Sequence, residues 1–82
     1  MATDALKTAV KVIGAKQVVK AVEKGVVCLV YLAEDADARV TNPVRELCVR
    51  AGVVIETVPN MTELGKACGI EVGAAAVALL RD

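Results

Sequence analysis

The sequence contains an unbroken run of eight apolar residues, Val26 to Ala33, in which valine is the most frequent residue. A strand that alternates polar and apolar residues has one face in water, whereas a continuous apolar run is typical of a strand covered on both faces. We therefore expect Val26 to Ala33 to be a central strand of a sheet that carries helices on both sides.

Glycines separate stretches in which the spacing of the apolar residues changes, as is typical of alternating helices and strands. The predicted helices are a short one capped by Asp4, one over Ala15 to Lys24, one that begins at Asn42-Pro43 and buries Val44, Leu47, Cys48 and Ala51, and one over Met61 to Cys68 with a capping box of Asn60 and Glu63. The predicted strands are Lys11 to Ile13, Val26 to Ala33, Val53 to Thr57 and Ala74 to Leu80. This order predicts a sheet between two helical layers, and the 82 residues suit a single domain over residues 1–82.

The chain has no histidine, which excludes Ser-His-Asp and Cys-His nucleophile systems and histidine-containing zinc sites within it. Cys28, Cys48 and Cys68 are an odd number without a C-x-x-C pair, so we interpret them as reduced thiols in the core. The start of the sequence lacks the features of a secretion signal, and no apolar run approaches the roughly 20 residues that span a bilayer. We expect a cytoplasmic protein that does not bind membranes.

An acidic cluster, Glu34, Asp35 and Asp37, follows the predicted central strand. Such a cluster could hold a metal or carry out acid-base chemistry, but turn and capping roles are more common for these residue types. Because no catalytic constellation is evident elsewhere, we expect a protein without enzyme activity, cofactor or metal.

The ten basic and ten acidic residues cancel, and Tyr31 is the one aromatic residue of the chain. RNA-recognition and single-strand-binding modules that stack bases on several aromatic side chains are therefore excluded. The charge is unevenly distributed, however. Residues 1–27 contain five lysines and two acidic residues, a net charge of +3, and the remainder carries −3. A local basic region can attract phosphates even when the whole protein is neutral.

Lys16 and Lys20 are four residues apart, so the helix from Ala15 places them on one side, with Gln17 near the same end. A helix N-terminus favours anions, and Gly14 allows another backbone to come close. These residues predict a site for a phosphate and a base edge. The alternative is that the two lysines only solvate an exposed helix face.

A glycine-bounded loop, Gly69 to Gly73, carries two branched apolar residues, Ile70 and Val72. If these side chains are exposed, they form a contact surface for another molecule. The alternative is that one or both fold back over the core.

Two segments carry a resemblance to a known family: Gly14-Ala15-Lys16-Gln17-Val18-Val19-Lys20, and the stretch from Leu64 to Val77, which reads LGKACGIEVGAAAV. Together with the strand exit Ala33-Glu34-Asp35-Ala36-Asp37, they resemble the kink-turn-binding ribosomal proteins of the L7Ae/L30e superfamily. The similarity extends over essentially the whole chain and is greatest to the small bacterial branch of YbxF-like and YlxQ-like proteins.

The resemblance implies a monomeric three-layer α/β/α sandwich with a small mixed four-stranded sheet. It also implies a non-catalytic protein that stabilises kink-turns, which are sharply bent internal loops with tandem sheared G·A pairs. The implied RNA is ribosomal or another structured regulatory RNA, with the ribosome as a further expected partner. The residues that match the family's RNA-binding positions are Gly14, Ala15, Lys16, Gln17, Lys20, Glu34, Ile70, Glu71, Val72 and Gly73.

Archaeal and eukaryotic relatives usually carry Asn-Glu where this chain has Lys16-Gln17. Because an amide replaces an acidic acceptor, we expect the choice of RNA or the affinity to differ. The Ile70 to Val72 loop is implied to lie beside an extruded nucleotide. An alternative function on the same fold is a protein-interaction module that uses Ile70 and Val72 as its contact patch.

Overall fold

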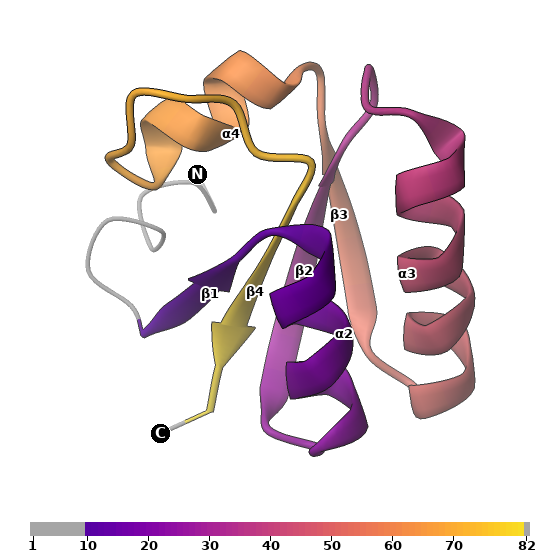
Figure 1. Ribbon diagram of the computed structural model, residues 1–82. Coiled ribbons are helices and arrows are strands. Elements are labelled where there is room, and N and C mark those ends of the chain that lie inside the picture. Colours follow the sequence, from indigo (N-terminus) through magenta and orange to yellow (C-terminus); the bar gives the residue numbers. More distant parts are fainter. Residues whose placement is uncertain (1–9, 82) are drawn as a thin grey trace.

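The computed structural model describes residues 10–81, which form four strands and three helices (Figure 1). In chain order the elements are β1 (Lys11–Ile13), α2 (Ala15–Glu23), β2 (Val27–Ala33), α3 (Ala38–Ala51), β3 (Val54–Val58), α4 (Met61–Ala67) and β4 (Ala76–Leu80). Apart from the start of α3, these bounds lie within two residues of the predicted ones. The predicted helix capped by Asp4 lies outside the described residues.

The four strands form one mixed sheet in the order β1-β4-β2-β3. Strands β2 and β3 are parallel, and β4 runs antiparallel to both of its neighbours, β1 and β2. The continuous apolar run therefore pairs on both sides, which confirms its prediction as a central strand. The predicted mixed four-stranded α/β fold is also confirmed.

Helices cover both faces of the sheet and create two separate cores (Figure 1). Val30 and Leu32 of β2 point into the core under α2 and α3, and Tyr31 and Ala33 point into the core under α4. The side chains of a strand alternate between its two faces, so this double burial is what an unbroken apolar run provides. The lone aromatic side chain, Tyr31, is 1% exposed, and this burial is the main cause that raises its pKa.

Cys28 departs from the expectation of a core thiol. The pairing of β2 with β4 shifts between Val27 and Leu29, and this β-bulge leaves Cys28 exposed. Cys48 and Cys68 are buried as expected, and burial raises the pKa of both thiols. The bulge could not be recognised from the apolar run, because a bulge interrupts strand pairing without interrupting the hydrophobic pattern.

The prediction that a helix begins at Asn42-Pro43 is wrong. Helix α3 begins at Ala38, and Asp37 is its N-cap, with a carboxylate oxygen that accepts a hydrogen bond from the Arg39 backbone N–H at 2.9 Å. Pro43 lies inside the helix, where proline removes one backbone hydrogen bond. Asp37 caps the helix and Thr41 is buried in its first turns, so the helix already exists before the local start signal of Asn42-Pro43.

The predicted inner face of α3 is correct for most of its length. Val44 and Cys48 are buried, and Leu47 is partly buried against the same core. Ala51, the last residue of the helix, is exposed, which corrects its prediction as a buried position.

Replacing Pro43 by alanine should stabilise the protein. The variant regains a backbone N–H, and alanine is a better helix former than proline. The unfolded chain of the variant is more flexible, which offsets part of this gain. We expect the free energy of unfolding to rise by about 1 to 2 kcal/mol. Urea denaturation measures the free energy of unfolding, with Asn42→Ala as a neighbouring control for helix propensity alone. An unchanged or lower stability in Pro43→Ala would show that the proline fits this helix without cost.

Candidate functional site

One end of the sheet gathers three segments that are distant in the sequence. The carbonyl oxygens of Ala75 and Ala76, which lead into β4, accept hydrogen bonds from the amides of Ala33 at 3.0 Å and Gly14 at 2.8 Å. These bonds place the exit of β2, the start of α2 and the Gly69 to Ala75 loop around a common point. All three described helices begin at this end, the upper end in Figure 1.

The start of α2 differs from the starts of the other two described helices. Asp37 caps α3 and Asn60 caps α4, the latter by accepting a hydrogen bond from the Glu63 N–H at 2.8 Å. At α2 the cap position is Gly14, with φ of 104°, and within residues 10–81 no side chain bonds to the first-turn N–H groups. That turn also contains no acidic residue. No side chain of the described residues therefore neutralises the positive end of this helix dipole.

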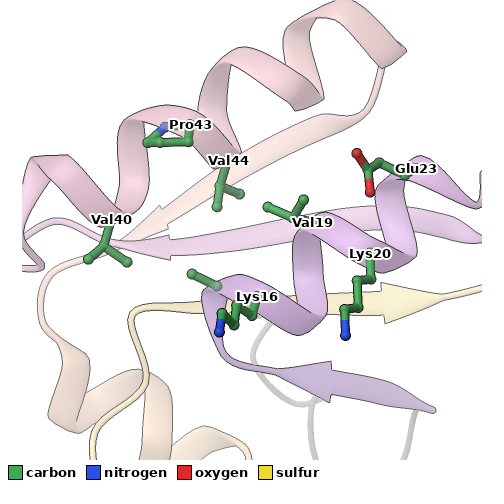
Figure 2. Close-up of a pocket in the computed structure, with 8 residues that line it drawn as sticks. Lys16, Val19, Lys20, Glu23, Val40, Pro43 and Val44 are labelled. Atoms are coloured by element: carbon green, nitrogen blue, oxygen red, sulfur yellow. The ribbon is translucent and has the colours of Figure 1, made fainter.

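Lys16 and Lys20 extend from the same side of α2 and point away from α3, as Figure 2 shows. Both are exposed, as is Gln17 in the first turn. Lys24 continues the four-residue spacing and is exposed too, although the sequence interpretation counted it only in the charge balance. Within residues 10–81 none of these lysines forms an ion pair. They are available to an external anion.

An apolar groove that was not anticipated lies between α2 and α3, and the residues that line it include Lys16 and Lys20 (Figure 2). Its volume is about 510 Å³. Val19 of α2 faces Val40, Pro43 and Val44 of α3 across it, and Glu23 also points toward α3. Recognising Asp37 as a helix cap would have placed Val40 in the first turn of α3, but its position opposite Val19 depends on how the two helices pack.

The two apolar side chains of the Gly69 to Gly73 loop differ in their exposure. Val72 is 71% exposed, whereas Ile70 is half-buried and packs against the core under α4. Glu71 and Gly73 are exposed. Both alternatives for this loop are thus realised, one at each residue, and the apolar surface that it offers is mainly Val72.

The acidic cluster has structural roles. The Asp35 carboxylate accepts a hydrogen bond from the Met61 N–H at 2.9 Å, which ties the end of β2 to the start of α4. Asp37 caps α3 and forms an ion pair with Arg39 at 2.9 Å. Glu34 is exposed, and its backbone N–H donates to the Val58 carbonyl oxygen. The turn and capping interpretation is confirmed for Asp35 and Asp37.

Within residues 10–81 no group of three histidine, cysteine or acidic side chains could hold a metal ion. None of the helices there combines the length and apolar character needed to cross a membrane.

The arrangement as a whole combines unneutralised helix N–H groups, a row of exposed lysines and an adjacent apolar loop. The sequence model of the ribosomal protein L7Ae/L30e/S12e/Gadd45 family matches residues 2–82, and the chain belongs to this family. The resemblance stated from the sequence is thereby confirmed.

Relatives within the family include a Bacillus pumilus protein described as an RNA-binding protein, which is 51% identical over 69 residues and 84% of each chain. RNA-binding protein YbxF of Geobacillus stearothermophilus is 47% identical over 70 residues, which cover 85% of each chain.

Solved structures show the same fold. A Bacillus halodurans protein described as having unknown function superposes with a TM-score of 0.86 at 28% identity, covering 95% of this chain and 82% of that one. The 15.5 kD RNA-binding protein of Giardia lamblia superposes with a TM-score of 0.90 at 24% identity, covering 99% of this chain and 72% of that one.

The Asp37 cap makes stability depend on acidic pH. Hydrogen bonds from the Arg39 side chain and backbone lower the pKa of Asp37 below its ordinary value of 3.8. The stabilisation is therefore complete above pH 3.8 and is lost as the pH falls through the lower pKa of the folded state. Over that range, wild type should lose stability more steeply than Asp37→Asn, whose neutral amide can still cap the helix. Thermal melts from neutral to acidic pH measure this, with Glu46→Gln on the same helix as the control, and parallel curves for wild type and Asp37→Asn would contradict it.

Proposed function

We propose that this protein is a non-enzymatic RNA-binding protein that recognises kink-turns through their tandem sheared G·A pairs and stabilises the bent form. Its RNA is ribosomal RNA or another structured regulatory RNA, and it acts as a monomer in the cytoplasm, on the ribosome or on a free RNA. The main observation behind the proposal is the uncapped start of α2, with its exposed Lys16, Gln17 and Lys20, at the same end as the loop that exposes Val72. The names of the curated relatives, RNA-binding proteins, support it.

In this proposal the start of α2 enters the groove of the RNA at the sheared G·A pairs. Free N–H groups and the helix dipole attract phosphate or base acceptors, and Gly14 and Ala15 keep the approach unobstructed by large side chains. Gln17 offers both an amide donor and an amide acceptor to base edges. A neutral acceptor bonds more weakly than a carboxylate, so the Lys16-Gln17 pair relies more on cationic contact than the Asn-Glu pair does.

The loop from Ile70 to Gly73 supplies the second part of the proposed interface. An extruded base cannot stack on an aromatic ring here, because Tyr31 is buried in the core under α4. The base instead lies against the exposed Val72, where removing apolar surface from water is favourable. Glu71, next to Val72 in the loop, and Glu34, at the exit of β2, are both exposed, and we assign them as acceptors for the amino groups of the base.

Bending costs the RNA free energy, because the fold brings phosphates together and unstacks a base. A protein shifts that equilibrium only by the difference between its affinities for the bent and extended forms. Contacts from α2 and from the loop meet at one end of the sheet, so a single rigid surface can touch both parts of a bent RNA at once. An extended RNA cannot satisfy both parts together.

We expect a kink-turn RNA to bind and to bend on addition of the protein. A matched RNA in which Watson–Crick pairs replace the sheared G·A pairs should bind much more weakly and stay extended, because the proposed groove contacts are lost. Fluorescence energy transfer between dyes on the two RNA arms reports the bend and the affinity together. Equal affinity for both RNAs would refute kink-turn recognition.

The alternative function, a protein-interaction module, can be tested separately. A partner that stays bound after RNase treatment and is lost in Val72→Asp would favour that module over an RNA-binding protein.

Lys20→Ala should reduce the dependence of RNA affinity on salt. A lysine that contacts one phosphate contributes about 0.7 to 0.9 to the slope of log affinity against log salt concentration, and its removal lowers the slope by that amount. Arg50→Ala, in the last turn of α3 and so at the end of that helix far from the site, serves as the control and should leave the slope unchanged. An unchanged slope in Lys20→Ala would remove that side chain from the phosphate contacts.

A further inference from the structure

The loop that exposes Val72 lies directly on the backbone of α4. A Cβ atom built on Gly65, inside α4, would overlap the carbonyl oxygen of Val72 and approach the carbonyl carbon of Val72 to 3.1 Å and the Cα of Gly73 to 3.3 Å. Gly65 is buried. Glycine weakens a helix interior relative to alanine, and its presence there commonly has a packing reason, which this contact supplies.

Both ends of the loop are tied to the same helix. The Ile70 N–H donates to the Gly65 carbonyl oxygen at 3.1 Å, and the Ala74 N–H donates to the Met61 carbonyl oxygen at 3.1 Å. The start of the helix is in turn held by the Asp35 carboxylate on the Met61 N–H. The chain between Ile70 and Ala74 is therefore short and anchored at both ends.

The Val72 side chain is not anchored in the core as the Ile70 side chain is. Its side chain is 71% exposed, whereas Ile70 packs into the core under α4. The position of the Val72 side chain is consequently set by where its backbone lies on α4, and Gly65 is the residue on which that backbone lies.

We propose that Gly65 is a positioning residue for RNA binding, which acts by fixing the height at which the loop from Ile70 to Gly73 lies on α4. The inference rests on the proposed function, since Val72 is taken as the apolar contact to the extruded base. A loop held in place before RNA arrives loses little conformational freedom on binding, so the contact surface is preformed. Any side chain at position 65 must displace the loop and so move Val72 away from the position in which it contacts the base.

The first test is a double-mutant cycle on the affinity of the full chain for a kink-turn RNA. Val72→Ala should weaken binding by up to about tenfold, because it removes two methyl groups from the contact. Gly65→Ala should weaken binding by a similar factor, and the Gly65→Ala/Val72→Ala double variant should lose little more. Gly65→Ala combined with Lys20→Ala should instead multiply the two separate losses, since Lys20 acts at α2.

Gly52→Ala is the matched control. Gly52 has φ of 73°, so alanine strains the backbone there, but nothing lies within 4 Å of the added methyl group. It ends α3, away from the loop. Gly52→Ala should lower thermal stability without changing RNA affinity, which separates general destabilisation from displacement of the loop.

A second measurement does not depend on RNA. Amide hydrogen exchange of Ile70 and Ala74, whose N–H groups bond to α4, should become faster in Gly65→Ala and remain unchanged relative to the rest of the protein in Gly52→Ala. If Gly65→Ala does not fold, Gly73→Ala replaces it, because its methyl group would meet the Met61 side chain at 3.0 Å and displaces the loop more gently.

Accelerated exchange with coupled loss of affinity supports the proposal. Full additivity of Gly65→Ala and Val72→Ala, or exchange at Ile70 and Ala74 no faster than in the control, would overturn it. If the wild-type protein binds no kink-turn RNA, the proposed function fails, and the exchange measurement still decides whether Gly65 positions the loop.

Discussion

Two adjacent carbonyl groups, those of Ala75 and Ala76, join the segments that form the candidate site. They accept hydrogen bonds from Ala33 and Gly14, so the entry into β4 is joined to the exit of β2 and to the start of α2. This is possible only because β4 inserts between β1 and β2 as an antiparallel strand. Without that strand order, the basic helix start and the apolar loop would not share one surface.

The capping of the helix N-termini explains how this chain can bind nucleic acid, although its net charge is zero and its one aromatic residue is buried. Asp37 and Asn60 cap the starts of α3 and α4 with their side chains, whereas no side chain among the described residues caps α2. The exposed lysines of α2 add to the same local field, which salt confines to about 10 Å. The acidic residues far from this end therefore do not cancel it. Under the proposed function the helix start contacts the RNA groove and aliphatic side chains cover an extruded base.

Much of the fold could be predicted from the sequence, because local signals agreed with the tertiary structure. The apolar run of β2, the buried face of α2 and the Asn60 cap each depend on neighbours in the chain. The start of α3 was missed because Asn42-Pro43 is a strong local start signal, and a better one, Asp37, lay five residues earlier. The exposure of Cys28 was missed because a bulge depends on the register of a partner strand.

The sequence by itself determined which segments are helices and strands, where the positive charge is concentrated and which family the site residues resemble. These properties follow from residue type and from spacings of three or four residues. Only the tertiary structure decided that Val72 is exposed while Ile70 is half-buried, that the loop lies on Gly65, and that α2 and α3 enclose an apolar groove. Those features arise from contacts between elements far apart in the chain, and such contacts are set by strand order and backbone packing rather than by any local pattern.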